Sequence, residues 1–256
     1  MCTLTAILVD ASSGLPADRS GLRVVMNRDE RDDRPAALPP RWRDLELGVG
    51  RAIWPTDAKA GGTWFAATTH GLVFALMNVS EPVSGGGADA SYLPHEKLSR
   101  GKIIPGLVAA RSFDDAIAAA RAIRVREYPP FQLIVFARDG GSLQTGVLRW
   151  NGVESKVMNY RGSSACFASS GLGDHLVQSR LGLFDDMLSN DGTSLPVTQD
   201  NFHRHQWSDA PHLSVLMRRP NHRTVSITTV VVHTSRHSGD GGVTDYEVEM
   251  FYVAMA

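Results

Sequence analysis

Cys2 and the charged segment that starts at Arg28 are the residues in this sequence with the clearest chemical potential. If the initiator methionine is removed, Cys2 carries both a thiol and a free α-amine. The amine has a reference pKa of about 7.7–8.0, so it can take up the thiol proton near neutral pH. One residue then supplies both nucleophile and base, as an N-terminal threonine does in other enzymes. We therefore expect Met1 to be absent from the active form.

Two short apolar segments are expected to bring these groups together. Residues 2–9 (CTLTAILV) and 22–26 (LRVVM) are rich in branched side chains, which favours strands. In an antiparallel hairpin the end of the second strand lies beside the start of the first, so Arg28 and Asp29 should lie next to Cys2. An adjacent guanidinium lowers the thiol pKa from its ordinary value of about 8.5, and a carboxylate can orient the α-ammonium group.

Each candidate also has a structural interpretation that involves no chemistry. Cys2 can be an inert core residue, because free cysteines are among the most buried residue types. Arg28 and Asp29 can form an ion pair that only supports the fold. Trp64 can belong to the core or line an acyl pocket, since aromatic side chains do both. Cys166, in the segment SSACFASS, is expected to be a core residue.

The composition argues against several classes of protein. Among the 256 residues, 26 Lys and Arg balance 27 Asp and Glu, so no basic excess predicts a nucleic-acid partner. No apolar run approaches the roughly 18–20 residues of a membrane-spanning helix, and the N-terminal segment lacks the pattern of a signal peptide. His203 and His205 lack the Cys or carboxylate spacing of a zinc site, so no metal is expected. We predict a cytoplasmic protein, and the sequence does not indicate its oligomeric state.

Hydrophobic periodicity predicts a series of strands with a few helices. Most strands come in pairs joined by short turns, which favours antiparallel sheets with helices on their outer faces. The Pro-rich segment at residues 34–44 is expected to be irregular, and one domain is expected over residues 1–256. The remaining predicted strands are residues 63–69, 72–77, 131–137, 142–150, 224–233 and 246–254, and the predicted helices follow Ser112 and Asp174.

The first third of the chain contains four short motifs, MC at the start, NRDE at residues 27–30, RP at residues 34–35 and GGTW at residues 61–64. In these motifs and their spacing the chain resembles the NRDE family, also called the transport and Golgi organisation 2 family. The segment ALMNVSEP, which contains Asn78, resembles the family as well and ends the similar region. The resemblance implies the N-terminal-nucleophile hydrolase fold. That fold is an α+β architecture in which two antiparallel sheets lie between helices, as a four-layer αββα sandwich.

The resemblance also implies roles for individual residues. Choloylglycine hydrolases and penicillin V acylases share this fold and the Met-Cys start, and by analogy Cys2 is the nucleophile. Arg28 then stabilises the thiolate, Asp29 orients the α-amine, and Asn78 donates a hydrogen bond in the oxyanion hole. The residues assigned to substrate binding are Asn27, Glu30 and Trp64.

Two functional hypotheses follow from these observations. In the first, the protein is an N-terminal-cysteine hydrolase or acyltransferase for a small-molecule, non-peptide amide or thioester, with an acyl-cysteine intermediate and no cofactor. In the second, it has no turnover and binds or carries haem, a lipid or an acyl-CoA, as the resemblance to the family implies. A cysteine or histidine can be an axial haem ligand, although the chain has no C-x-x-C-H attachment motif.

Overall fold

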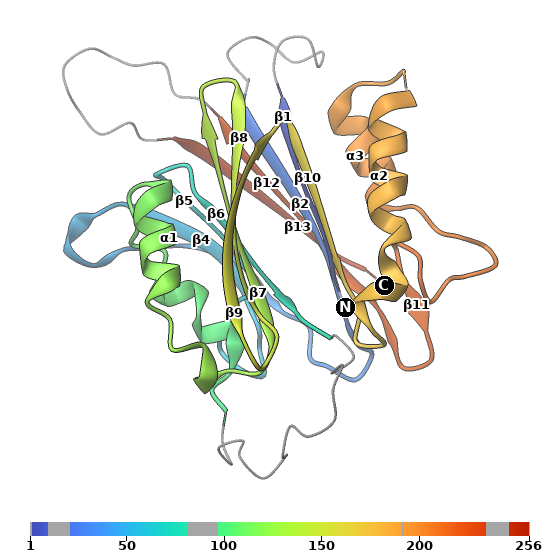
Figure 1. The fold of residues 1–256 in the computed structure, drawn as a ribbon, viewed down its shortest axis with the longest axis horizontal. Coiled ribbons are helices and arrows are strands. Elements are labelled where there is room, and N and C mark those ends of the chain that lie inside the picture. Colours follow the sequence, from blue (N-terminus) through green and yellow to red (C-terminus); the bar gives the residue numbers. More distant parts are fainter. Residues whose placement is uncertain (1, 10–20, 81–96, 191, 234–245, 256) are drawn as a thin grey trace.

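The computed structural model describes residues 2–9, 21–80, 97–190, 192–233 and 246–255, and Figure 1 shows their arrangement. Two antiparallel sheets face each other across a shared core, and helices cover the outer face of each sheet. The layers therefore run helix, sheet, sheet, helix. This arrangement confirms the predicted α+β fold class.

The first sheet holds the N-terminal strand between two partners. The strand order is β10–β1–β2–β12–β11, and β13 also pairs with β12. Cys2 lies opposite Arg28 of β2 on one side and opposite Ser169 of β10 on the other, which ties down the start of the strand. The predicted pairing of the first two strands is therefore confirmed. The strands are β1 (Cys2–Val9), β2 (Gly21–Arg31), β10 (Ser164–Ser169), β11 (Arg218–Arg219), β12 (His222–His233) and β13 (Glu247–Ala254).

The second sheet is a meander of seven strands in sequence order. Its edge strand, β3, lies in the segment that we expected to be irregular because of its prolines. Pro39 and Pro40 are tolerated there because β3 pairs with β4 alone, and because both prolines lie where the pairing is interrupted by an irregularity between Leu38 and Arg41. The strands are β3 (Leu38–Asp44), β4 (Arg51–Thr56), β5 (Phe65–Thr68), β6 (Val73–Asn78), β7 (Phe131–Asp139), β8 (Ser142–Trp150) and β9 (Ser155–Gly162).

Three α-helices in the described ranges supply the outer layers. α1 (Phe113–Arg121) packs against β7 and β8, while α2 (Ser179–Asn190) and α3 (Leu195–His203) pack against β10, β1 and β2. Ser112 caps α1 as predicted, because its Oγ accepts a 3.1 Å hydrogen bond from the Asp115 N–H. Short 3₁₀ turns occur at Glu46–Gly48, Arg100–Lys102, Ile104–Gly106, Val125–Glu127 and Asp174–Val177.

Alternation along β1 determines what lies on each face of the first sheet. Leu4 and Ala6 point into the core between the sheets. Thr3 and Thr5 point the other way, and their hydroxyl groups form hydrogen bonds with side chains of α2 and α3. Cys2 shares the face of Leu4 and packs against the edge of the inter-sheet core. The sheet therefore presents Cys2 between the two sheets, with a polar layer behind its strand.

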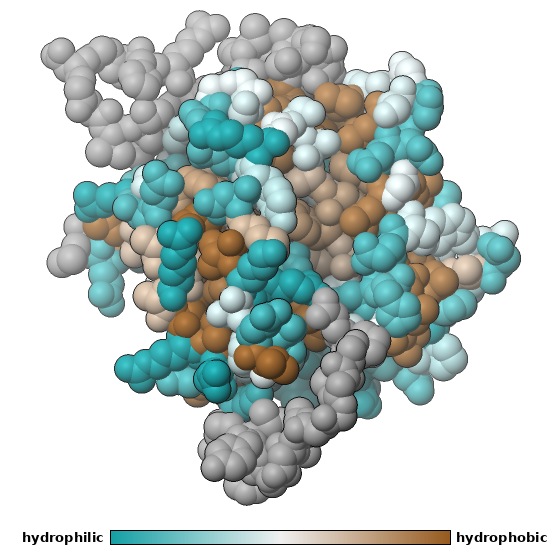
Figure 2. All heavy atoms as spheres, viewed as in Figure 1, coloured by the Kyte–Doolittle hydropathy of each residue, from teal (hydrophilic) through white to brown (hydrophobic). Residues whose placement is uncertain are grey.

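The face of the molecule seen in Figure 1 has mixed polarity. Figure 2 shows apolar side chains gathered mainly between the two sheets, where the core reaches the surface, and polar side chains around them. Within the described ranges, no helix is both long enough and apolar enough to span a membrane.

Candidate active site

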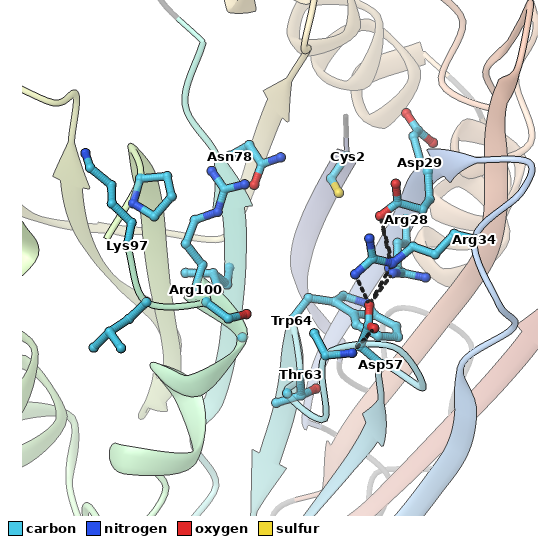
Figure 3. Close-up of a pocket in the computed structure, with 18 residues that line it drawn as sticks. Cys2, Arg28, Asp29, Arg34, Asp57, Thr63, Trp64, Asn78, Lys97 and Arg100 are labelled. Atoms are coloured by element: carbon cyan, nitrogen blue, oxygen red, sulfur yellow. Dashed lines mark hydrogen bonds and ion pairs between the residues drawn. The ribbon is translucent and has the colours of Figure 1, made fainter. Parts of the chain in front are cut away.

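A cavity of about 330 Å³ opens between the two sheets at the start of β1 (Figure 3). β1 and β2 line one side, and the end of β6 with the 3₁₀ turn at Arg100–Lys102 lines the other. Asn27 is the only predicted site residue that does not line this cavity. The six that meet here are Cys2, Arg28, Asp29, Glu30, Trp64 and Asn78.

The Cys2 side chain points into this cavity (Figure 3). Cys2 is partly buried, and the protein packed around its sulfur raises the pKa of the thiol. The negative charge of Asp29 raises the pKa further, whereas the Asp29 backbone N–H, which donates to the sulfur, and the Arg28 guanidinium lower it. The reactivity of the thiol therefore depends on cations around it.

Arg28 lies beside Cys2, but its charge is shared with two carboxylates. Its Nη2 donates to Asp57 Oδ2 at 2.8 Å and lies 3.4 Å from Glu30 Oε2. The guanidinium carbon lies 4.2 Å from the centroid of the Trp64 ring, a cation–π contact. The positive charge of Arg28 is thus shared within a charged cluster beside the sulfur.

Asp57, which no sequence motif predicted as a site residue, is the centre of this cluster. Arg34 Nη2 donates to Asp57 Oδ2 at 2.8 Å, and the backbone N–H groups of Lys59 and Ala60 donate to Oδ1. Burial raises the pKa of Asp57, but hydrogen bonds from the Ala60 N–H and the Arg34 guanidinium outweigh it and hold the pKa below its ordinary range. An ionised Asp57 therefore fixes the orientation of both arginines.

Asp29 is buried next to Cys2 and keeps one oxygen free. Oδ1 accepts a 2.6 Å hydrogen bond from the Thr224 hydroxyl, and Nη1 of Arg180 lies 3.9 Å from Oδ2. Oδ2 has no hydrogen-bond partner in the part of the chain that the structure describes. Burial raises the pKa of Asp29, and the Arg180 charge and the Thr224 hydrogen bond counteract that rise. Oδ2 is thus an available acceptor beside the residue that would carry an α-ammonium group.

Asn78 and Arg100 lie together on the wall that faces Cys2 (Figure 3). Asn78 is the last residue of β6, and its side chain is exposed to the cavity. Arg100 Nη1 donates to the Pro130 carbonyl oxygen at 2.8 Å. Burial lowers the pKa of Arg100, and the nearby Cys2 and Glu30 oppose this change. An amide donor and a guanidinium thus face the sulfur from across the cavity.

The two glycines of GGTW allow the Arg100 turn to approach the site. Gly61 has a φ of +68°, which the turn after Asp57 requires. A Cβ atom at Gly62 would lie 2.5 Å from the carbonyl group of Gly101, so the two backbones can pack only without side chains. The Thr63 N–H donates to the Gly101 carbonyl oxygen at 2.9 Å and holds this contact.

Asn27 is buried on the other face of β2, which corrects its predicted role in substrate binding. Its Nδ2 donates to the carbonyl oxygens of His203 and Val215, each at 2.9 Å, and the His203 Nδ1–H donates to its Oδ1 at 2.8 Å. Burial holds the pKa of His203 well below its ordinary range, so this imidazole is neutral. Side chains alternate along a strand, so Asn27 faces α3 because its neighbour Arg28 faces the cavity.

The other candidate groups do not form a second centre. Among the described residues, no three His, Cys, Asp or Glu side chains are grouped so that they could hold a metal ion. Cys166 packs against the apolar cluster under α2, where burial strongly raises the pKa of its thiol. Cys166 is therefore partly buried at the edge of an apolar cluster, away from the cavity that Cys2 lines.

Comparison with known families identifies the chain. The model of the family described as Transport and Golgi organisation 2 matches residues 1–181. The chain belongs to this family. The assignment confirms the resemblance carried by the NRDE and GGTW motifs. No curated protein matches the sequence.

Solved structures place this Transport and Golgi organisation 2 protein in a fold group. The Caenorhabditis elegans ortholog of N-acylethanolamine-hydrolyzing acid amidase is similar with a TM-score of 0.55 and 12% identity, over 88% of this chain and 91% of that chain. The C2A mutant of conjugated bile acid hydrolase from Clostridium perfringens has a TM-score of 0.48 and 9% identity, over 97% and 96% of the two chains. The first likeness shows that the family member has the N-terminal-nucleophile hydrolase fold.

Several polar and charged residues of this Transport and Golgi organisation 2 site were not predicted. Only the burial of Arg180 could have been predicted from the sequence. Arg180 lies three residues after Val177 and four before Phe184, on the apolar stripe of the predicted helix. A charge on such a stripe needs a buried partner. Thr224 lies in β12, where nothing in the sequence marks its hydroxyl as part of the site, and the others lie in turns and connections without periodicity. The missed residues are Arg34, Asp57, Lys97, Arg100, Arg180 and Thr224.

Arg28→Gln is expected to slow alkylation of Cys2 by iodoacetamide roughly 3–10-fold near pH 7, because loss of the guanidinium raises the thiol pKa. The rate is measured against pH, and peptide mass spectrometry separates Cys2 from Cys166. Arg31→Gln is the matched control, since Arg31 is on the same strand but forms an exposed pair with Asp33 at 2.7 Å. A profile for Arg28→Gln that coincides with the wild-type profile would remove Arg28 from the site.

Proposed function

We propose that this protein is an N-terminal-cysteine hydrolase or acyltransferase that acts on a small-molecule amide or thioester. The observation that carries the proposal is the convergence of Cys2, Asp29 and Asn78 on one cavity between the sheets. A sulfur nucleophile, a free carboxylate oxygen and an amide donor on the opposite wall are the groups that acyl transfer requires. A shared fold does not define an activity, so the proposal rests on these side chains.

Activation of the sulfur begins with removal of Met1, which turns the Cys2 nitrogen into an amine. The thiol proton moves to this amine and leaves a thiolate and an α-ammonium group on one residue. Asp29 Oδ2 is the acceptor available for the ammonium group. Formation of the ion pair offsets the burial that otherwise raises the thiol pKa.

The thiolate then attacks the carbonyl carbon of the substrate, and the π electrons of the carbonyl group move onto oxygen. Asn78 Nδ2 can donate a hydrogen bond to this oxyanion from the wall that faces Cys2. Collapse of the tetrahedral species breaks the bond to the leaving group and gives an acyl-cysteine. The leaving group, whether an amine or a thiolate, takes up the proton of the α-ammonium group, so that the α-amine is free again.

Release of the acyl group repeats these steps in reverse order. Water, or an acceptor amine, gives a proton to the α-amine and attacks the acyl carbon. The sulfur leaves as a thiolate and takes the proton back, which restores the Cys2 thiol and the free amine. The product is a carboxylic acid when water attacks and an amide when an amine attacks.

The carrier hypothesis uses the same cavity and predicts a different measurement. Haem and acyl-CoA are anionic, and the cationic side chains that line the cavity are Arg28, Arg34, Lys97 and Arg100. Binding through the sulfur predicts a shift of the haem Soret band when haem is added to the protein, and loss of that shift in Cys2→Ala. No shift with the wild-type protein favours acyl transfer.

Intact mass spectrometry tests the proposed function directly. Incubation with a panel of acyl thioesters and amides, including N-acylethanolamines, is expected to add one acyl group to the Cys2 peptide of protein that lacks Met1. Cys2→Ala should show no adduct, while Cys166→Ala should keep it. An adduct that persists in Cys2→Ala contradicts the assignment of the nucleophile. Full retention of Met1 in protein that still acylates at Cys2 contradicts the assignment of the α-amine as base.

A further inference from the structure

Arg180 of α2 is a fully buried arginine behind the strand that carries Cys2. Its Nε donates to the Leu213 carbonyl oxygen at 2.9 Å, and its Nη1 donates to the Thr3 hydroxyl at 2.7 Å. The same Nη1 lies 3.9 Å from Asp29 Oδ2. One guanidinium therefore connects α2 with the N-terminal strand and with the carboxylate beside the proposed nucleophile.

The Arg180–Asp29 pair is open. Asp29 Oδ2 and Arg180 Nη2 are both buried and have no hydrogen-bond partner among the described residues. Burial of two opposite charges requires good geometry and further hydrogen bonds before it stabilises a fold. A pair that served stability alone would be expected to close, whereas this geometry leaves Oδ2 free for another donor.

The charges around Cys2 indicate that a second cation is needed to balance two neighbouring anions. Attack by the sulfur requires a thiolate next to the Asp29 carboxylate, and the charge of that carboxylate raises the pKa of the thiol. The α-ammonium group of Cys2 balances one of these two anions. The guanidinium of Arg180 lies 3.9 Å from Asp29 Oδ2 and is bound to Thr3, the residue next to Cys2. Burial lowers the pKa of Arg180, and the negative charges of Asp29 and of a Cys2 thiolate oppose that change.

We propose that Arg180 is a positioning residue that supplies the second positive charge, so that the Cys2 thiolate and the Asp29 carboxylate can exist together. This inference rests on the proposed function of the site. In the described part of the chain, Arg180 is the cation within 4.0 Å of that carboxylate, and Arg28 is bound to Asp57. The other groups that face Asp29 are Thr224 of β12, which donates to Oδ1, and Arg219 of β11, whose charge also lowers the pKa of Asp29.

The contacts of Arg180 explain why an arginine occupies this position. Its planar guanidinium donates to Leu213 and Thr3 through two different nitrogens and still directs charge toward Asp29. A lysine carries the same charge on a single nitrogen. Arg180→Lys is therefore expected to keep the electrostatic effect and to lose part of the hydrogen bonding.

The test is the pH dependence of Cys2 alkylation by iodoacetamide in four variants. The midpoint is the pH at which the alkylation rate is half its maximum, and it reports the pKa of the Cys2 thiol. Arg180→Met should raise this midpoint and slow alkylation roughly 3–10-fold near pH 7, whereas Asp29→Asn should lower it. The double variant should return close to wild type, because it loses one charge of each sign. Arg180→Lys should also stay near wild type. No substrate is needed, so this result is independent of the acyl-adduct test of the proposed function.

Arg23→Met is the matched control. Arg23 lies on the same face of β2 as Asp29, but near the other end of the strand, and it pairs with Asp200 at 2.8 Å. Its midpoint should equal that of the wild type. A folded Arg180→Met protein with the wild-type midpoint overturns the proposal, and so does a double variant that keeps a raised midpoint. If Arg180→Met does not fold, a folded double variant with a near-wild-type midpoint supports the proposal. Failure of both to fold assigns Arg180 to the scaffold alone.

Discussion

Cys2→Ser is expected to slow acyl-adduct formation by at least about 100-fold, because thiolate is accessible near neutral pH and alkoxide is not. The melting temperature should change by no more than about 2 °C, since the hydroxyl is nearly isosteric with the thiol. The Asp29 backbone N–H that donates to the sulfur can donate to the serine oxygen instead. Intact mass against time and thermal unfolding measure the two quantities.

Cys166→Ser is the matched control, and the opposite pattern is expected for it. Cys166 packs against the apolar cluster that contains Ile7 and Phe184. Because Cys166 is only partly buried, a hydroxyl there without a partner costs up to about 1 kcal/mol, which lowers the melting temperature slightly while acylation continues. If Cys2→Ser shows this second pattern, Cys2 is a core residue and the proposed chemistry is wrong.

The neighbourhood of Cys2 could be predicted because it depends on one local pairing. β1 and β2 are consecutive strands, and their apolar alternation permits a register that buries both inner faces. That register places Cys2 opposite Arg28. The same alternation contains the information that Asn27 faces the other way. The assignment of Asn27 to substrate binding followed the motif and not the alternation, and it was wrong for that reason.

Asp57 and Arg100 could not be predicted in this way, because their positions depend on packing between distant segments. Both residues reach the cavity only when the second sheet closes over the first. A sequence pattern reports which face of an element is apolar, and it does not report which elements meet. The contact of Gly62 with Gly101 is another example, since neither glycine alone predicts the other as its neighbour.

Asp57→Asn is expected to lower the free energy of unfolding by about 3 kcal/mol, which corresponds to a fall in melting temperature of about 6–12 °C. Asparagine keeps the shape and can still accept from the Lys59 and Ala60 N–H groups. It removes the negative charge that Arg28 and Arg34 share, and Arg28 is 7% exposed. Thermal and denaturant unfolding near neutral pH measure the change.

The pH dependence of this contribution has a defined sign. The pKa of Asp57 in the folded protein lies below its ordinary range. The stabilisation is therefore present above the unfolded carboxyl pKa of about 3.9 and is lost as the pH falls through the lower folded pKa. The difference in stability between wild type and Asp57→Asn should shrink across that acidic window.

Asp139→Asn is the control for burial. Asp139 pairs with Arg161 at 2.7 Å, close to the 2.8 Å of the Arg28–Asp57 pair. The side chains of Arg161 and Asp139 are, however, 60% and 52% exposed. Exposed pairs contribute little, so this variant should change the free energy of unfolding by no more than about 0.5–1 kcal/mol. Equal losses for the two variants would mean that burial of the Asp57 cluster is not the source of its stability.

The same Asp57→Asn variant should also alkylate faster at Cys2 near pH 7, the reverse of Arg28→Gln. Without Asp57, less negative charge compensates Arg28, so the guanidinium stabilises the thiolate more strongly and the thiol pKa falls. Opposite shifts from the two partners of one ion pair cannot arise from a general loss of packing, which would change both rates in the same direction. If Asp57→Asn lowers stability and leaves the alkylation profile unchanged, the cluster supports the fold and does not set the reactivity of the sulfur.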